Sequence, residues 1–320
     1  MSDSDPNVAI ACQGGGSHTA FTAGVLDVLL DEEELDVDVV GFSGTSGGAI
    51  CALLAWYGMV HDDHEPGELL LDFWAEISAS SPVDYTANAS TQWMTQLRGM
   101  GMYVPEISPY YSPGSRLGQE HLRRLLETCV DFETIPELLA EDDDHPGLFI
   151  SAVEVLTNEF ELFREDDMSA DAILASAAEP SAFNAVEIDG RYYWDGLFAK
   201  NPPIQDFSVA EDVPDPDEVW VIKINPTERD HVPKSLNGIM DRRNELAGNV
   251  ALKTDVRFIE QVNRWIESGY LPDRYTHTTV ERIRLSLDLD WGTKSDRDPQ
   301  FLQRLIRDGR DQARAFLDGR

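Results

Sequence analysis

Residues 37–60, VDVVGFSGTSGGAICALLAWYGMV, decide the fold that we predict for this chain. The stretch opens with an apolar run, turns at the sequence GTSGG (residues 44–48), and continues as a long apolar segment. This pattern is typical of a buried strand, a tight glycine turn and a buried helix. A serine in such a turn lies at the helix N-terminus, where the helix dipole favours developing negative charge. The sequence therefore indicates a nucleophile elbow built around Ser46, with a purely structural turn as the alternative.

A similar strand-turn-helix unit comes earlier in the chain. Residues 8–12 are apolar, three glycines follow at 14–16, and residues 20–30 have the apolar spacing of a helix. Glycines expose successive backbone N–H groups, which suits either a dinucleotide pyrophosphate or the oxyanion of a tetrahedral intermediate. The dinucleotide pattern G-x-G-x-x-G is incomplete because Thr19 stands at its last position, so we favour an oxyanion hole. Two such units in series predict an α/β fold with a parallel sheet.

The rest of the chain continues with strands and helices. We predict strands at residues 148–155, 160–163, 219–224 and 280–289, helices at 69–77, 117–126, 169–178 and 299–317, and two helical stretches between 235 and 270. A hairpin is expected over residues 186–194, because the pair Asp189-Gly190 suits a type I′ turn. Asp195 follows this hairpin directly. The Trp, Met and Tyr residues between 93 and 111 suit either a flexible lid or acyl-chain wall, or ordinary core.

The charge of the chain is strongly acidic. It has 59 acidic and 25 basic residues and a formal net charge of −34. Nucleic acid is therefore a poor partner, since such a surface repels phosphate backbones. The composition resembles that of proteins from salt-loving organisms, because at molar salt a screening length of about 3 Å suppresses self-repulsion. We expect salt to stabilise the protein; an acidic protein from an ordinary environment is the alternative.

Further features bear on compartment and cofactors. Cys12, Cys51 and Cys129 lack metal or disulfide spacing, which favours a reducing compartment. No signal peptide is readable, and the longest apolar run, residues 49–60, is short of the ~20 residues that cross a bilayer. We therefore expect a cytoplasmic protein. The sequence HDDH at 61–64 is interpreted as a solvated turn, so neither a metal nor an organic cofactor is expected.

Several stretches, taken in order, resemble the patatin-like phospholipases, and in detail their bacterial branch. They are QGGGSHTAFTAGVL at 13–26, FSGTSGGA at 42–49, AILAS at 172–176, and AVEIDGRYYWDG at 185–196 with Asn201-Pro202. The resemblance covers roughly residues 8–225. It implies a three-layer α/β/α fold with a mainly parallel central sheet. The expected organisation is a disordered N-terminus (1–6), a patatin-like phospholipase domain (7–225) and a mainly helical C-terminal extension packed on the same core (226–320).

The resemblance also implies a chemistry, namely a serine–aspartate dyad that cleaves lipid esters without a histidine. Ser46 matches the nucleophile and Asp195 the proton acceptor. The expected oxyanion hole comprises Gly14, Gly15, Gly16 and Gly47, and the remaining motif glycines are Gly44, Gly48 and Gly196. Because an unperturbed aspartate has a pKa of about 3.9, burial beside Trp194 would need to raise the pKa of Asp195 before it could act as a base.

Three positions depart from the usual family pattern, and two rival hypotheses follow. His18 replaces a Lys or Arg, Thr19 a glycine, and Leu197 a Gly or Ala. The last two departures motivate a catalytically impaired lipid-binding or regulatory module as one rival. The other is an α/β-hydrolase with a Ser-Asp-His triad, whose histidine would be His231 or His277. Transient contact with a membrane surface and the oligomeric state are left open by the sequence.

Overall fold

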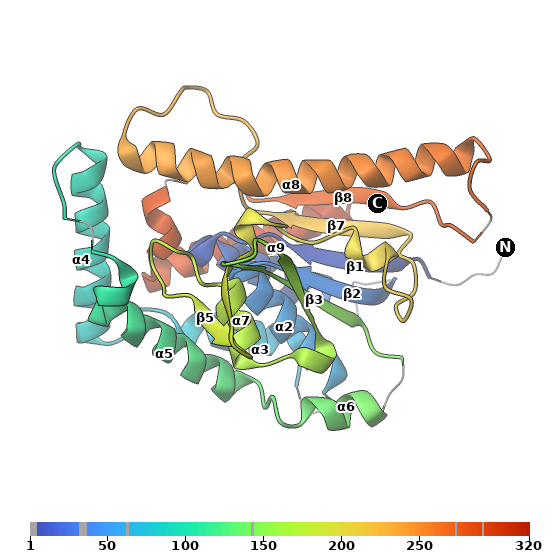
Figure 1. The fold of residues 1–320 in the computed structure, drawn as a ribbon, viewed down its shortest axis with the longest axis horizontal. Coiled ribbons are helices and arrows are strands. Elements are labelled where there is room, and N and C mark those ends of the chain that lie inside the picture. The colour runs from blue at the N-terminus through green and yellow to red at the C-terminus, as the bar shows by residue number, and fades with distance from the viewer. Residues whose placement is uncertain are drawn as a thin grey trace.

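A mixed sheet forms the centre of the computed structural model, which describes residues 5–31, 37–61, 64–105, 107–141, 144–272, 274–289 and 291–320 (Figure 1). The strands described in these ranges are β1 (Asn7–Cys12), β2 (Asp38–Gly44), β3 (Gly147–Glu154), β4 (Phe160–Arg164), β5 (Val186–Ile188), β6 (Arg191–Asp195), β7 (Glu218–Lys223) and β8 (Thr279–Arg284). Their order is β5-β6-β3-β2-β1-β7-β8, with β4 also paired to β3. Strands β3, β2, β1, β7 and β8 are parallel, and β4, β5 and β6 pair antiparallel.

Helices cover both faces of this sheet. The described helices are α1 (Ala20–Leu29), α2 (Gly47–Val60), α3 (Pro66–Glu76), α4 (Pro82–Gly99), α5 (Pro113–Cys129), α6 (Ile135–Glu141), α7 (Ala170–Ser176), α8 (Leu236–Glu267) and α9 (Pro299–Leu317). Helix α8 runs along one face, and α2, α7 and α9 lie on the other (Figure 1). The predicted three-layer α/β/α arrangement is confirmed.

The side-chain alternation of β1 explains why both faces are covered. Val8, Ile10 and Cys12 belong to the larger hydrophobic core, together with side chains of α1, α2 and α9. Ala9 and Ala11 point to the opposite face, into the core that α8 closes. Successive residues of a strand face opposite sides, so a strand that is apolar throughout must be buried on both.

The C-terminal region completes this core. Strand β8 pairs in parallel with β7, and α9 packs along α1. The predicted pair of helical stretches is a single continuous helix, α8, so that detail of the prediction was wrong. The expected disorder of the N-terminus falls mostly on residues 1–4, which lie outside the described residues.

Two expectations on buried and membrane-related segments can also be compared with the structure. Cys12, Cys51 and Cys129 are free thiols, in line with their lack of disulfide spacing; the first two are buried and Cys129 is half-buried. None of the helices in the described part of the chain combines the length and apolarity that a membrane crossing requires.

Candidate active site

Ser46 occupies a strained turn between β2 and α2. Its backbone has φ 58° and ψ −129°, a conformation that residues other than glycine rarely adopt. The backbone N–H of Ser46 donates a 2.9 Å hydrogen bond to Oγ of Ser176 on α7. Glycines allow this tight turn, since a Cβ at Gly48 would lie 2.8 Å from the carbonyl oxygen of Gln13. The predicted elbow geometry is therefore present, with the serine between strand and helix.

Asp195 ends β6 and faces Ser46. Its side chain is only 2% exposed and accepts a 2.8 Å hydrogen bond from the N–H of Leu197. Burial raises the pKa of Asp195 to about 7, and the charge of Glu179 adds to the rise, while the N–H of Leu197 and the neighbouring side chain of Ser46 oppose it. A carboxylate with this pKa accepts a proton far better than an unperturbed aspartate.

The strand geometry separates the side chains of Asp195 and Trp194. Trp194 precedes Asp195 on β6, and adjacent strand residues point to opposite faces of the sheet. Asp195 pairs with Ala152 of β3, and the following Gly196 packs so closely against that strand that a Cβ would lie 2.8 Å from the carbonyl carbon of Ser151. Glycine at position 196 thus lets Asp195 sit close to the neighbouring strand.

The glycine loop after β1 is held by two asparagines. The N–H of Gly14 donates to Oδ1 of Asn201 (2.7 Å), and its carbonyl accepts from Nδ2 of Asn225 (2.8 Å). Gly16 has φ 59°, a left-handed conformation that favours glycine. Among the described residues, the N–H groups of Gly15, Gly16 and Gly47 donate to no other group. Three amides are thus left free to bind an anion, while that of Gly14 is engaged.

Thr19 and Leu197, two of the three departures from the family pattern, fit without strain. Thr19 has the right-handed helical conformation (φ −74°, ψ −3°), and its hydroxyl donates a 2.6 Å hydrogen bond to the carbonyl of Gly16. The half-buried Leu197 lies toward α8, with its Cδ1 close to the backbone of Gly248. Neither residue therefore distorts the loop or the aspartate.

The histidines lie in different surroundings. His18 is buried, its Nε2 lies 2.7 Å from Oγ1 of Thr293, and burial, with a smaller contribution from the charge of Lys294, lowers its pKa to about 3. His277 lies just before β8, at the amino-terminal edge of the sheet, whereas Ser46 follows the carboxyl end of β2. His231 is exposed in the connection between β7 and α8. The structure therefore places His277 at the wrong edge for a triad with Ser46.

Sequence analysis assigned no role to three residues that support the site, Asn201, Ser176 and Asn225. Asn201 stands beside a proline in one family-like stretch, and Ser176 ends another, AILAS, so the sequence offered a hint of a role for both. For Asn225 the sequence offered no hint beyond its place after β7.

The HDDH turn lies partly outside the described residues, and within them the rings of His61 and His64 lie beside Tyr57. In the part of the chain that the structure describes, no three His, Cys, Asp or Glu side chains are grouped as a metal site.

Comparison with known proteins identifies the family of the chain. The sequence model of the patatin-like phospholipase family matches residues 10–208, more than half of the chain. The chain therefore belongs to the patatin-like phospholipase family, whose name denotes lipid acyl hydrolysis. No curated protein matches the chain in sequence.

Among solved structures, similar chains include VipD from Legionella pneumophila, with 12% identity, a TM-score of 0.48, and coverage of 99% of this chain and 67% of VipD. The type III effector ExoU shows 16% identity and a TM-score of 0.38, covering 98% of this chain and 53% of ExoU. The complex of SpcU with ExoU from Pseudomonas aeruginosa gives 16% identity and a TM-score of 0.29, covering 78% and 53%. The chain thus spans about half the length of ExoU. The bacterial branch and the salt-loving source stay predictions.

Proposed function

We propose that the protein is a serine lipid acyl hydrolase that cleaves carboxylic esters through a dyad of Ser46 and Asp195. The observation that carries this proposal is the pairing of the strained Ser46 with a buried aspartate, whose pKa is raised to about 7 by burial and is lowered in turn by the side chain of Ser46. Nucleophile and base are neighbours, as nucleophilic catalysis requires. The family membership supports a lipid ester as the substrate.

The reaction follows from these positions. The Oγ of Ser46 attacks the ester carbonyl carbon, and its proton passes to Asp195. The tetrahedral intermediate then collapses, the ester C–O bond breaks, and the leaving alcohol takes the proton from Asp195. Water attacks the resulting acyl-serine and gives a proton to Asp195, and that proton returns to Ser46 as the fatty acid leaves.

The oxyanion of each tetrahedral intermediate is proposed to bind the N–H groups of Gly15, Gly16 and Gly47. These amides have no partner among the described residues, and each such donor contributes about 10²-fold or more to the rate. The amide of Gly14 is bonded to Asn201, so we assign Gly14 to holding the loop in place. Glycine at 16 suits a backbone that presents its N–H in a left-handed turn.

A surface near the site suits the lipid phase that carries the substrate. The apolar arm consists of α4, the following residues 100–105 and 107–108, and the short helix η2 (Pro109–Tyr111). Residues 85–105 contain a single charged residue, whereas 26% of the whole chain is charged. Trp93 is 62% exposed, Met100 77% and Tyr103 91%, so these side chains are not the core that was one of our expectations. Exposed Trp, Tyr and Met in a charge-poor segment suit the interface of a membrane.

The position of the arm favours this role. Helix α4 stands beyond the end of the sheet toward which the parallel strands run, the edge where Ser46 lies (Figure 1). The arm is tied to that edge, since Asn237 Nδ2 at the start of α8 donates to the carbonyl of Thr95, and Ala185 N donates to the hydroxyl of Tyr110. We therefore propose that the arm makes transient contact with the lipid surface.

The direct test is the hydrolysis of a soluble p-nitrophenyl ester by wild type, Ser46→Ala and Asp195→Asn. We expect each substitution to lower kcat by at least about 10³-fold, because both groups act in every step. Matched controls are Ser43→Ala, which removes a buried hydroxyl without a partner among the described residues, and Asp255→Asn, which replaces another buried aspartate whose pKa is raised to about 6.

Both controls should keep at least half of the wild-type rate, since neither residue is placed at Ser46. Retained activity in folded Asp195→Asn would contradict the dyad, and an inert wild type would favour the lipid-binding module. Loss of activity in His231→Ala would instead favour a triad.

A further inference from the structure

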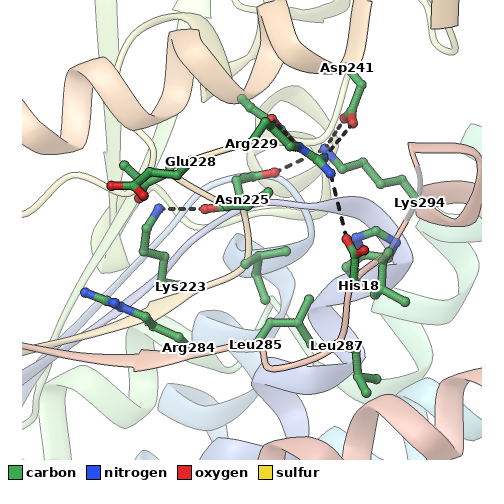
Figure 2. Close-up of a pocket in the computed structure, with 16 residues that line it drawn as sticks. His18, Lys223, Asn225, Glu228, Arg229, Asp241, Arg284, Leu285, Leu287 and Lys294 are labelled. Carbon is green, nitrogen blue, oxygen red and sulfur yellow. Dashed lines mark hydrogen bonds and ion pairs between the residues drawn. The ribbon is translucent and has the colours of Figure 1, made fainter. Parts of the chain in front are cut away.

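A cavity lies behind the glycine loop, away from Ser46 and Asp195. Its volume is about 410 Å³, and it opens at the carboxyl ends of β7 and β8 (Figure 2). His18 and Ile224 form part of its wall, while Leu285 and Leu287 supply apolar side chains. Neither member of the proposed dyad lines this cavity, so it is a separate site.

Two cations at one end of the cavity have no carboxylate partner among the described residues. Lys223 ends β7 and faces Arg284 across the strand pair. Within the described residues, no carboxylate oxygen lies within 4 Å of the side-chain nitrogens of either residue. The ammonium of Lys223 donates only to neutral oxygens, namely the carbonyl of Asn225 (2.6 Å) and Oδ1 of Asn249. Burial, reinforced by Arg284, lowers the pKa of Lys223 to about 8, which leaves it mostly charged at neutral pH.

At the other end of the cavity, the cations are paired with carboxylates. Lys294 and Arg229 both bind Asp241, at 3.0 and 3.2 Å, and Arg229 also binds the buried Glu245. Two exposed carboxylates also line the cavity: Glu228, which is drawn on the side of Lys223 in Figure 2, and Asp288, at 3.9 Å from Arg229. The chain has 59 acidic residues, yet none of the carboxylates in its described part lies within 4 Å of the ammonium of the buried Lys223, and Glu245 acts on it only at longer range.

We propose that this cavity binds a phosphate monoester or diester through the ammonium of Lys223 and the guanidinium of Arg284. A buried cation without a counter-charge is costly, so an anion that enters the cavity is stabilised. The fork of an arginine matches two phosphate oxygens, and a lysine adds a point charge. The side chains of Leu285 and Leu287 provide an apolar surface for the organic group of the ester. The phosphate can come from a soluble ester or from a lipid headgroup.

The cavity is connected to the glycine loop through Asn225 (Figure 2). Its carbonyl accepts from Lys223, its Oδ1 accepts from Lys294 (3.1 Å), and its Nδ2 donates to the carbonyl of Gly14. Lys223, the proposed phosphate ligand, is thus linked to the glycine loop by two successive hydrogen bonds.

The test measures binding, so it does not depend on the proposed hydrolysis. Calorimetric titration with glycerol 3-phosphate and co-sedimentation with phosphatidylcholine vesicles containing phosphatidic acid are carried out on wild type, Lys223→Gln and Arg284→Gln. We expect each variant to bind the soluble ester or the acidic vesicles at least about tenfold more weakly, since a charge-assisted hydrogen bond contributes that much. Arg307→Gln, an exposed change on α9, should bind as wild type does.

The two binding measurements distinguish the possible sources of the phosphate. Loss confined to glycerol 3-phosphate identifies a soluble ligand, and loss confined to acidic vesicles identifies a headgroup. Arg284 is exposed, so its variant should fold even if Lys223→Gln does not. The proposal is overturned if wild type binds neither probe, or if Arg284→Gln and the Arg307→Gln control bind both equally well.

Discussion

The nucleophile elbow and the apolar arm place opposite demands on their glycines and side chains. Around Ser46 the backbone is packed so closely that a Cβ at Gly14 would lie 2.6 Å from the carbonyl oxygen of Thr45. In the arm, nothing lies within 4 Å of a Cβ added at Gly99, and the large apolar side chains face outward. The elbow depends on backbone fit and the arm on composition, so the two regions should respond differently to the same substitutions.

The largest expected contrast comes from glycine-to-alanine changes in the two regions. At Gly48 a methyl group would collide with the backbone of β1, which we expect to cost about 1–3 kcal/mol or more in unfolding free energy and at least about 10²-fold in ester hydrolysis. At Gly99, at the end of α4, the same change should leave activity intact and raise stability by up to about 1 kcal/mol. Denaturant unfolding and soluble-ester kinetics measure both effects. Equal stability of the two variants would contradict the difference in backbone packing that we infer between the elbow and the arm.

A smaller, surface-specific effect should come from the arm. The double substitution Trp93→Ser with Tyr103→Ser removes two exposed aromatic rings, and we expect hydrolysis of phospholipid vesicles to fall at least about tenfold, because each ring that enters the lipid phase completely contributes up to roughly 1.5–3 kcal/mol. The rate on a soluble p-nitrophenyl ester should stay within about twofold of wild type, since the arm does not touch Ser46.

The matched control for the arm is Tyr270→Ser. Tyr270 is 78% exposed and follows the far end of α8, away from α4 (Figure 1). This variant should hydrolyse vesicles as wild type does. An equal loss in both variants would mean that the arm has no special role at the lipid surface.

The elbow could be predicted from the sequence because its constraints are local. A strand, a glycine turn and a helix must follow one another within residues 37–60, and only glycine fits at several of these positions. The hairpin turn at Asp189-Gly190 was predictable for the same reason, and both residues have positive φ as a type I′ turn requires.

The arm and α8 were harder to predict, for physical reasons. Helix α4 buries only Asn88 fully, so its sequence lacks the apolar periodicity that reveals a helix. Helix α8 contains Gly248, which looks like a break, but a Cβ there would lie 2.8 Å from Nδ2 of Asn201. The contact with Asn201 explains why glycine stands at position 248, and such a tertiary contact cannot be recognised in the sequence. The link from Asn225 to the glycine loop is likewise a contact between residues 211 positions apart.

The most direct test of the central claim is the pH dependence with which a soluble fluorophosphonate labels Ser46. Because Asp195 must be ionised to take the proton, and its pKa is about 7, the labelling rate should rise with pH and reach half its maximum near pH 7. An unperturbed aspartate, with a pKa of about 3.9, would give a flat profile above about pH 5. We expect the rise in wild type and a loss of labelling in Asp195→Asn; a flat profile, or equal labelling of the two proteins, would contradict the account.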